Sequence, residues 1–201
     1  PAQPPAAAID VARPREAWTR RLTLEHAAYR SAGPSAIAHA PRGFDPEAPL
    51  HLVVFLHGYS GCAEVLFGSG ETRCAADLPA EPGWGLGEVH DEAGTNTLFV
   101  VLQLAWRQRE GSPGALGREG QFAALLSELL ADLEPELGAS RHASDLASVT
   151  LAAHSAAFET TIALLRRGGV EIRNVILLDA LYSGVPVFVE WAADDAFSRT
   201  L

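Results

Sequence analysis

The sequence predicts an α/β fold, with a mostly parallel sheet covered by helices on both faces. Two observations support this prediction. Short apolar, β-branched runs recur along the 201-residue chain, and amphipathic helical patterns lie between them. Runs of this kind are typical of parallel strands buried on both faces. We expect one α/β domain over residues 15–201, with ligands meeting the carboxyl ends of its strands.

Four apolar runs are predicted to form the central parallel strands. They are residues 51–58, 97–105, 147–155 and 173–181. Upstream, segments 20–30 and 35–41 could add two edge strands. The segment 58–96 is rich in glycine and is predicted to be a long loop, and loops of that length tend to be functional.

Helical patterns fill the remaining connections. Segment 120–137 carries leucines at the i, i+3, i+4 spacing of an amphipathic helix, and segment 158–169 ends in arginines followed by two glycines. Segment 186–198 is predicted to be a helix, with Phe188, Trp191 and Phe197 facing inward. If this segment were instead the next parallel strand, a crossover of about 10–12 residues or more would have to connect it to the strand before it. Only "ALYSG" separates the two segments, which is too short.

Composition excludes some classes of partner. Residues 1–14 are rich in proline and alanine, which predicts a flexible lead-in. The formal net charge of −10 argues against nucleic-acid binding, and no apolar run is long enough to span a membrane. Two cysteines cannot by themselves form a structural zinc site, and we expect no metal or organic cofactor.

The two cysteines, Cys62 and Cys74, lie twelve residues apart in the glycine-rich segment. We predict a disulfide between them, in an oxidising compartment. Secreted or periplasmic localisation would agree with that bond. The alternative is two unrelated thiols in a cytoplasmic protein.

Ser155 stands between a predicted strand and a predicted helix, in "VTLAAHSAAFETTIALL" at 149–165. A sharp turn there would project its hydroxyl above the sheet, where the next backbone N–H and the helix dipole can stabilise an oxyanion. Ala153 and Ala157 are small, as close approach of strand and helix requires. The alternative is an inert serine at a strand–helix turn.

The segment "AHSAA" resembles the nucleophile elbow of the α/β-hydrolase superfamily, whose common form is G-x-S-x-G, with alanines here in place of both glycines. Upstream, "VVFLHGYSG" resembles the superfamily's strand and HG oxyanion loop. The order of elements also matches over roughly residues 50–182. The resemblance implies a serine hydrolase that cleaves an ester or amide through an acyl-enzyme on Ser155. Its substrate would be a small molecule or peptide with a carbonyl to attack.

The resemblance also implies roles for individual residues. His57 and Gly58 would shape the oxyanion loop, and the backbone N–H groups of Tyr59 and Ala156 would hold the oxyanion. Trp106, Arg107 and Arg109 follow a strand on the same side and are candidate substrate contacts.

The acid of the triad has three candidates, Asp179, Asp194 and Asp195. In the superfamily the acid follows the serine in the chain and precedes the histidine. The crossover-length argument favours Asp179, which ends a predicted strand, whereas its alternative role is to cap a turn.

No histidine follows Asp179 in the sequence. We therefore expect the catalytic histidine beyond residue 201, in a longer protein whose last strands this chain lacks. Such a chain should expose Phe188, Trp191 and Phe197. The alternative is a non-catalytic, α/β-hydrolase-like binding protein.

Overall fold

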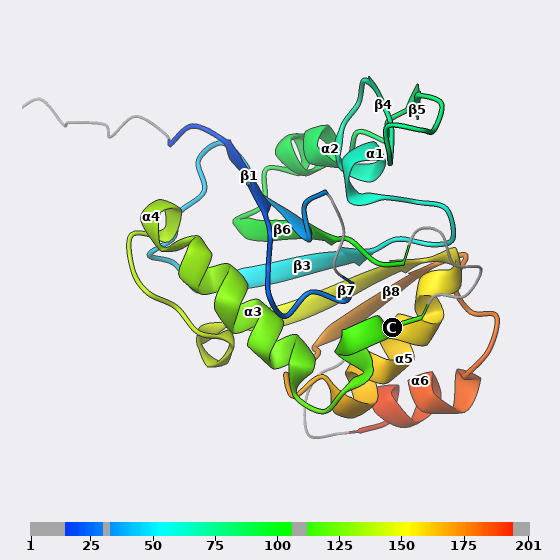
Figure 1. The fold of residues 1–201 in the computed structure, drawn as a ribbon. Coiled ribbons are helices and arrows are strands. Elements are labelled where there is room, and N and C mark those ends of the chain that lie inside the picture. Colours follow the sequence, from blue (N-terminus) through cyan, green and yellow to red (C-terminus); the bar gives the residue numbers. More distant parts are fainter. Residues whose placement is uncertain (1–14, 30–32, 106–111, 195–201) are drawn as a thin grey trace, which may run out of the picture.

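The structure, a computed structural model, describes residues 15–29, 33–105 and 112–194. A six-stranded sheet in the order β1-β2-β6-β3-β7-β8 forms its centre (Figure 1). The pairs β6–β3, β3–β7 and β7–β8 are parallel, and β1–β2 and β2–β6 are antiparallel. The predicted mostly parallel α/β fold is therefore confirmed. The strands are β1 (Trp18–Leu22), β2 (Ala36–Ala40), β3 (His51–Leu56), β6 (Thr97–Leu102), β7 (Ser148–His154) and β8 (Asn174–Leu178).

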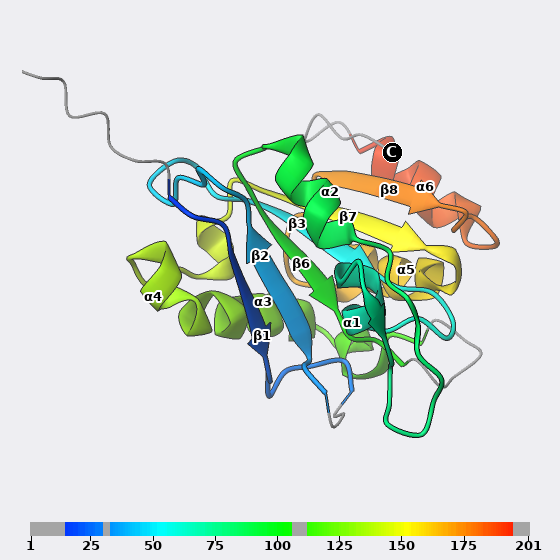
Figure 2. The same cartoon turned by 90° about the horizontal axis from the view of Figure 1, so that it is seen from above.

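Side chains of alternate strand residues point to opposite faces of the sheet, as the two-residue repeat of a strand requires. On one face Leu52, Val54 and Leu56 join the larger core, against α3 (Gln121–Asp132) and α5 (Phe158–Arg167). On the other face Phe55 and Val101 join a smaller core with α1 (Ala63–Phe67), and α2 (Leu86–Ala93) lies on the same side (Figures 1 and 2). The central strands of the sheet are thus buried between two layers of helices.

Only one of the two upstream strands lies at an edge. β1 is the outer strand, whereas β2 pairs with β1 on one side and β6 on the other. The prediction of two edge strands is therefore wrong for segment 35–41. Every residue of β2 is buried, in keeping with its interior position.

The prediction of a long loop over 58–96 is also wrong. This segment contains α1, α2 and a short hairpin of β4 (Glu71–Thr72) and β5 (Glu81–Pro82). A five-residue helix is too short to show a periodic pattern in sequence. It forms because Ala63 and Leu66 bury their side chains against the sheet.

The helical pattern of 120–137 is divided into two helices. α3 ends at Asp132, and α4 (Glu134–Leu137) follows with Pro135 in its first turn. Proline has no backbone N–H, so the hydrogen bonds of a single helix cannot run through it. The leucine side chains of α3 face the core as predicted.

A helix is predicted over 186–198, and the structure has one over 185–192 that ends before Ala193 and Asp194. In α6 (Val185–Ala192), Phe188 is 1% exposed and Trp191 is 8% exposed. The expectation that this chain exposes both aromatics is wrong, because α6 packs them against the core. Phe197 lies outside the described residues, as do residues 1–14.

Exposed apolar side chains lie instead on the last strand of the sheet. Ile176 and Leu178 of β8 are 46% and 44% exposed, on the face opposite Val175. On this face α1 packs over β2 and β6, which lie away from β8 in the sheet. Among the described residues, no helix has both the length and the apolar composition needed to cross a membrane.

Candidate active site

The connections of the sheet change direction between β3 and β7. The chain leaves β3 through α1 and α2 to reach β6, and it leaves β7 through α5 on the opposite face to reach β8 (Figures 1 and 2). Diverging connections of this kind leave a crevice at the carboxyl ends of the two strands, where α/β proteins bind ligands. Gly58 and Ser155 follow β3 and β7 and lie at this crevice.

Ser155 adopts a left-handed backbone conformation, with φ of +54°. It joins the end of β7 to a 3₁₀ turn over Ser155–Ala157, which leads directly into α5. A non-glycine residue held there costs about 1–3 kcal/mol and is found mainly at functional sites. Ala153 and Ala157 are both 0% exposed, so strand and helix meet closely without glycine at either position.

Gly58 packs directly against this turn. A Cβ atom on Gly58 would lie 2.7 Å from the Ser155 Cβ and 3.0 Å from the His154 carbonyl oxygen. No larger residue fits there without a shift of the backbone. The loop that begins at Gly58 is thereby held beside the serine, with Tyr59 next in the chain and half exposed.

His57 is buried, and its ring holds the start of this loop. Its Nε2 accepts a hydrogen bond from the Leu104 N–H (2.8 Å), so we place the ring proton on Nδ1, which donates to the Gly58 carbonyl (2.8 Å). Burial lowers the pKa of His57 from 6.5 to about 4, so the ring is neutral at pH 7. A neutral ring whose two nitrogens are both bonded cannot take a proton from Ser155.

Gln103 is a buried residue of this site that sequence reasoning missed. Its Oε1 accepts from the Ala63 N–H at the start of α1 (3.0 Å), and its Nε2 donates to the Leu104 carbonyl (2.8 Å). The same Nε2 lies 3.0 Å from His57 Nε2. One amide thus ties α1, the end of β6 and the histidine together. The available signal was a polar residue within an apolar predicted strand.

Asp179 lies beside the serine. β7 and β8 are parallel with His154 opposite Leu178, so Ser155 and Asp179 are the first residues after the ends of two neighbouring strands. Asp179 is exposed and also has a positive φ, +47°. The strand predicted to end at Asp179 ends one residue earlier, at Leu178, so Asp179 follows its carboxyl end.

Tyr182 contacts both residues and was also missed from sequence. Its hydroxyl donates a hydrogen bond to Asp179 Oδ2 at 2.8 Å. That bond is the main reason why the pKa of Tyr182 is raised, and an interaction with the Ser155 side chain opposes the rise. The ring also packs edge-on against Phe158. The available signal was an aromatic residue three positions after the candidate acid.

The other acid candidates lie elsewhere. Asp194 follows α6 and lines a separate cavity with Leu165 and Trp191. α6 runs back from the carboxyl edge of the sheet, so its last turn lies away from Ser155 (Figure 1). Asp195 lies outside the described residues, as do Trp106, Arg107 and Arg109.

None of the seven histidines, all in the described ranges, hydrogen-bonds to Ser155 or Asp179. His154 instead packs its ring edge-on against Trp84, with centroids 5.0 Å apart. Five further histidines each hydrogen-bond to a residue outside the site. His26 bonds to Glu128, His39 to Thr19, His51 to Ser148, His90 to Thr97, and the His142 backbone to Asp145.

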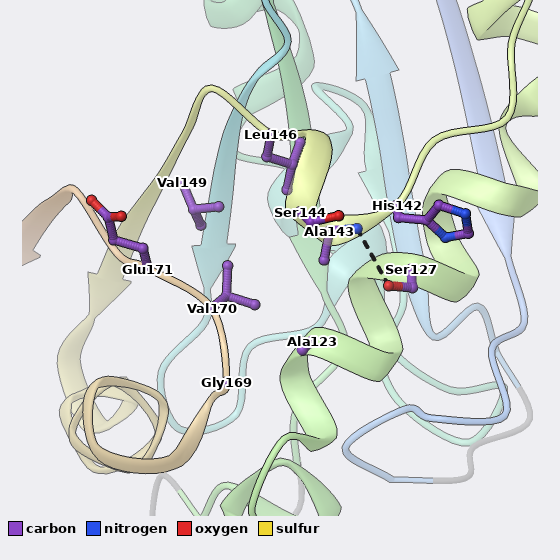
Figure 3. Close-up of a pocket in the computed structure, with 10 residues that line it drawn as sticks. All are labelled: Ala123, Ser127, His142, Ala143, Ser144, Leu146, Val149, Gly169, Val170 and Glu171. Carbon is purple, nitrogen blue, oxygen red and sulfur yellow. Dashed lines mark hydrogen bonds between the residues drawn. The ribbon is translucent and has the colours of Figure 1, made fainter.

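Two cavities help to locate the site. A pocket of about 160 Å³ is lined by Gly58, Tyr59 and His154, next to Ser155. A cavity of about 490 Å³ lies between α3 and the loop after α5, and Figure 3 shows Ser127, Val149 and Glu171 among its lining residues. Val149 lies near the start of β7 and Ser155 follows its end, six residues later, which is about 20 Å along a strand. The larger cavity is therefore not part of the serine site.

The segment beside the pocket is cross-linked. Cys62 and Cys74 form a disulfide, with Cα atoms 5.6 Å apart. It joins the start of α1 to the loop that follows β4. Within the described ranges, no three His, Cys, Asp or Glu side chains gather in a way that could hold a metal ion.

No family model matches this sequence, and no curated protein matches it. Solved structures that resemble the chain include brefeldin A esterase, a bacterial homologue of human hormone-sensitive lipase. That likeness has a TM-score of 0.41 and 16% identity, over 85% of this chain and 42% of that one. An inhibited esterase B from Lactobacillus rhamnosis has a TM-score of 0.40 and 12% identity, over 84% and 50% of the two chains. This chain therefore spans half or less of the length of these esterases, and TM-scores this low assign no activity to it.

Proposed function

We propose that this chain carries the nucleophile of a serine hydrolase that cleaves an ester or amide through an acyl-enzyme on Ser155. The observation that carries the proposal is the left-handed Ser155 at the end of β7, with Gly58 packed against it. A strained serine at the carboxyl edge of a sheet, beside a loop such as the one that begins at Gly58, is the arrangement that acyl transfer uses.

In the proposed reaction the Ser155 hydroxyl attacks the carbonyl carbon and passes its proton to a histidine. The Tyr59 and Ala156 backbone N–H groups hold the oxyanion of the tetrahedral intermediate. Ala156 lies in the first turn of the helix, where N–H groups have no intrahelical acceptor. The intermediate then expels an alcohol or amine, which takes the proton from the histidine. Water hydrolyses the remaining acyl-enzyme by the reverse proton path.

Asp179 is proposed to orient that histidine and to stabilise its protonated form. Its position beside Ser155, after the paired residues of β7 and β8, supports this role. The histidine itself is proposed to lie in sequence beyond residue 201. Tyr182 occupies one carboxylate oxygen of Asp179, which leaves the other for an imidazole.

A fluorophosphonate probe tests the nucleophile in the full-length protein. The probe should label Ser155, and Ser155→Ala should abolish the labelling. Ser144→Ala is the matched control, because Ser144 lines the distant cavity and should leave labelling unchanged. Labelling that survives Ser155→Ala, or never occurs in folded full-length protein, would contradict the proposal.

A binding protein without catalysis is the second candidate. It is favoured by one observation, namely that Tyr182 and not a histidine contacts both Asp179 and Ser155 in the described residues. In that case a carbonyl-bearing small molecule or peptide would bind at the crevice without turnover.

We also propose secreted or periplasmic localisation, which the Cys62–Cys74 disulfide supports.

A further inference from the structure

The pocket beside Ser155 is too small to hold a whole substrate. Its volume is about 160 Å³, well below the roughly 300–1,000 Å³ of pockets that enclose drug-sized ligands. Gly58, which packs against Ser155, and His154, which precedes it, both form part of its wall. The pocket is therefore suited to one group of a molecule whose reacting atom lies at Ser155.

Aromatic rings and one acid define the chemistry of the pocket. Tyr59 and Trp84 line it and are 53% and 50% exposed, and the His154 ring packs against Trp84. Apolar Val65 and the buried Leu66 complete the wall on the α1 side.

Apart from His57, His154 and Tyr59, Glu81 is the only described residue of the pocket lining with an ionisable acidic or basic side chain. The chain has no lysine. In the part of the chain that the structure describes, no arginine comes within ion-pair distance of Glu81. Among the described residues, the Glu81 carboxylate therefore has no cation to neutralise it.

We propose that this pocket binds an alkylammonium group, such as a quaternary amine, carried by the substrate. Aromatic rings attract ammonium ions through their negative faces, and an unpaired carboxylate adds a direct attraction. An apolar group in the same place would gain no attraction from the Glu81 carboxylate. The net charge of −10 further raises the local concentration of cations. That the group belongs to a substrate rests on the proposed hydrolase function.

The aromatic wall is held in place before any ligand arrives. The backbone N–H of Trp84 donates to the Val65 carbonyl at 2.8 Å, which ties the residue to α1. Gly83, just before it, is packed so closely that a Cβ atom would lie 1.8 Å from the Gly68 carbonyl oxygen. A rigid wall reduces the entropy lost on binding.

Binding to the 201-residue chain tests the proposal without any need for catalysis. The probes are choline and its neutral isostere 3,3-dimethylbutan-1-ol, titrated while the indole N–H signal of Trp84 is followed by NMR. Trp84→Leu identifies that signal by its loss. Choline should bind at least about five-fold more tightly than the neutral alcohol. Glu81→Gln should remove most of that difference, and Glu71→Gln, at an exposed acid that does not line the pocket, should leave it unchanged.

Equal affinity for the two probes, or an unchanged ratio in Glu81→Gln, would overturn the proposal and indicate a plain apolar pocket. Failure of the hydrolase proposal is seen separately, as absent fluorophosphonate labelling of Ser155. If labelling does occur, saturating choline should slow it, whereas the neutral alcohol at the same concentration should have less effect.

Discussion

Gly58 and Ser155 pack closely at the ends of two neighbouring strands, and a Cβ on Gly58 would lie only 2.7 Å from the Ser155 Cβ. One residue is a glycine because there is no space for a side chain. The other has a φ of +54°, which serine rarely adopts. Each constrains the other, so the loop after β3 and the turn after β7 form one unit.

Gly58→Ala should therefore impair the site more than the fold. The added methyl group forces the loop away from Ser155, and displacement of oxyanion donors costs about 10²–10³-fold in rate. The rate of fluorophosphonate labelling in the full-length protein measures this loss. Gly70→Ala is the control, because a Cβ there meets nothing within 4 Å. Equal labelling rates in the two variants would show that the contact does not matter for reactivity.

Asp179→Asn should reduce turnover by orders of magnitude in the full-length protein, because asparagine cannot stabilise a protonated imidazole. Tyr182→Phe removes one hydrogen bond to the acid and should have a much smaller effect. Asp194→Asn should be nearly silent, since Asp194 lies beyond α6. Steady-state kinetics on an activated ester would measure all three. If Asp194 proves essential and Asp179 dispensable, the assignment of the acid is wrong.

Gln103→Leu should destabilise the fold. It removes the partners of the Ala63 N–H and the Leu104 carbonyl, and each buried group left unsatisfied costs about 1–3 kcal/mol. Urea unfolding followed by circular dichroism would give the loss. Gln121→Leu should cost less, because its amide makes a single 3.4 Å bond to the His26 carbonyl. Similar midpoints for both variants would argue against Gln103 as a structural link.

Stability should fall as pH is lowered from about 6.5 to about 4. Burial lowers the pKa of both His57 and His90 from 6.5 to about 4. In this window the unfolded chain binds two protons that the folded chain does not, so the unfolding free energy falls by up to about 1.4 kcal/mol per pH unit for each histidine. His90→Gln should roughly halve that slope, whereas His142→Gln, at an exposed site, should not change it. Urea titrations across the window would measure it, and a flat profile would contradict the prediction.

Reduction of the Cys62–Cys74 disulfide should destabilise the protein by about 3 kcal/mol, the value expected for a closed loop of about this length. Urea unfolding with and without reductant would measure the loss, with the Cys62→Ser, Cys74→Ser double variant as the control that reductant should not affect. A thiol reagent should find no reactive cysteine in unreduced protein. Two reactive thiols in protein isolated from an oxidising compartment would refute the bond and the secreted assignment.

The sequence by itself determined the parallel strands and the order in which they occur. Runs such as 51–58 and 147–155 are apolar on both faces. A strand that is buried on both faces can be identified from such a run alone, without knowledge of the strands that pair with it. It also located Ser155 and Asp179 at strand ends, because the carboxyl ends of parallel strands share one edge. The alternation of strand and helix limited the fold to one class.

Only the tertiary structure decided how these parts meet. The conformation of Ser155 depends on Gly58, which is 97 residues earlier in the chain. α1 exists because its short apolar face is buried against the sheet, not because its sequence is strongly helical. β2 became an interior strand through pairing with β6, which no local pattern reveals. Gln103, Tyr182 and Trp84 likewise gained their roles from contacts across the sheet and its loops, since hydrogen-bond partners and pocket walls are set by distances in space and not by spacing along the chain.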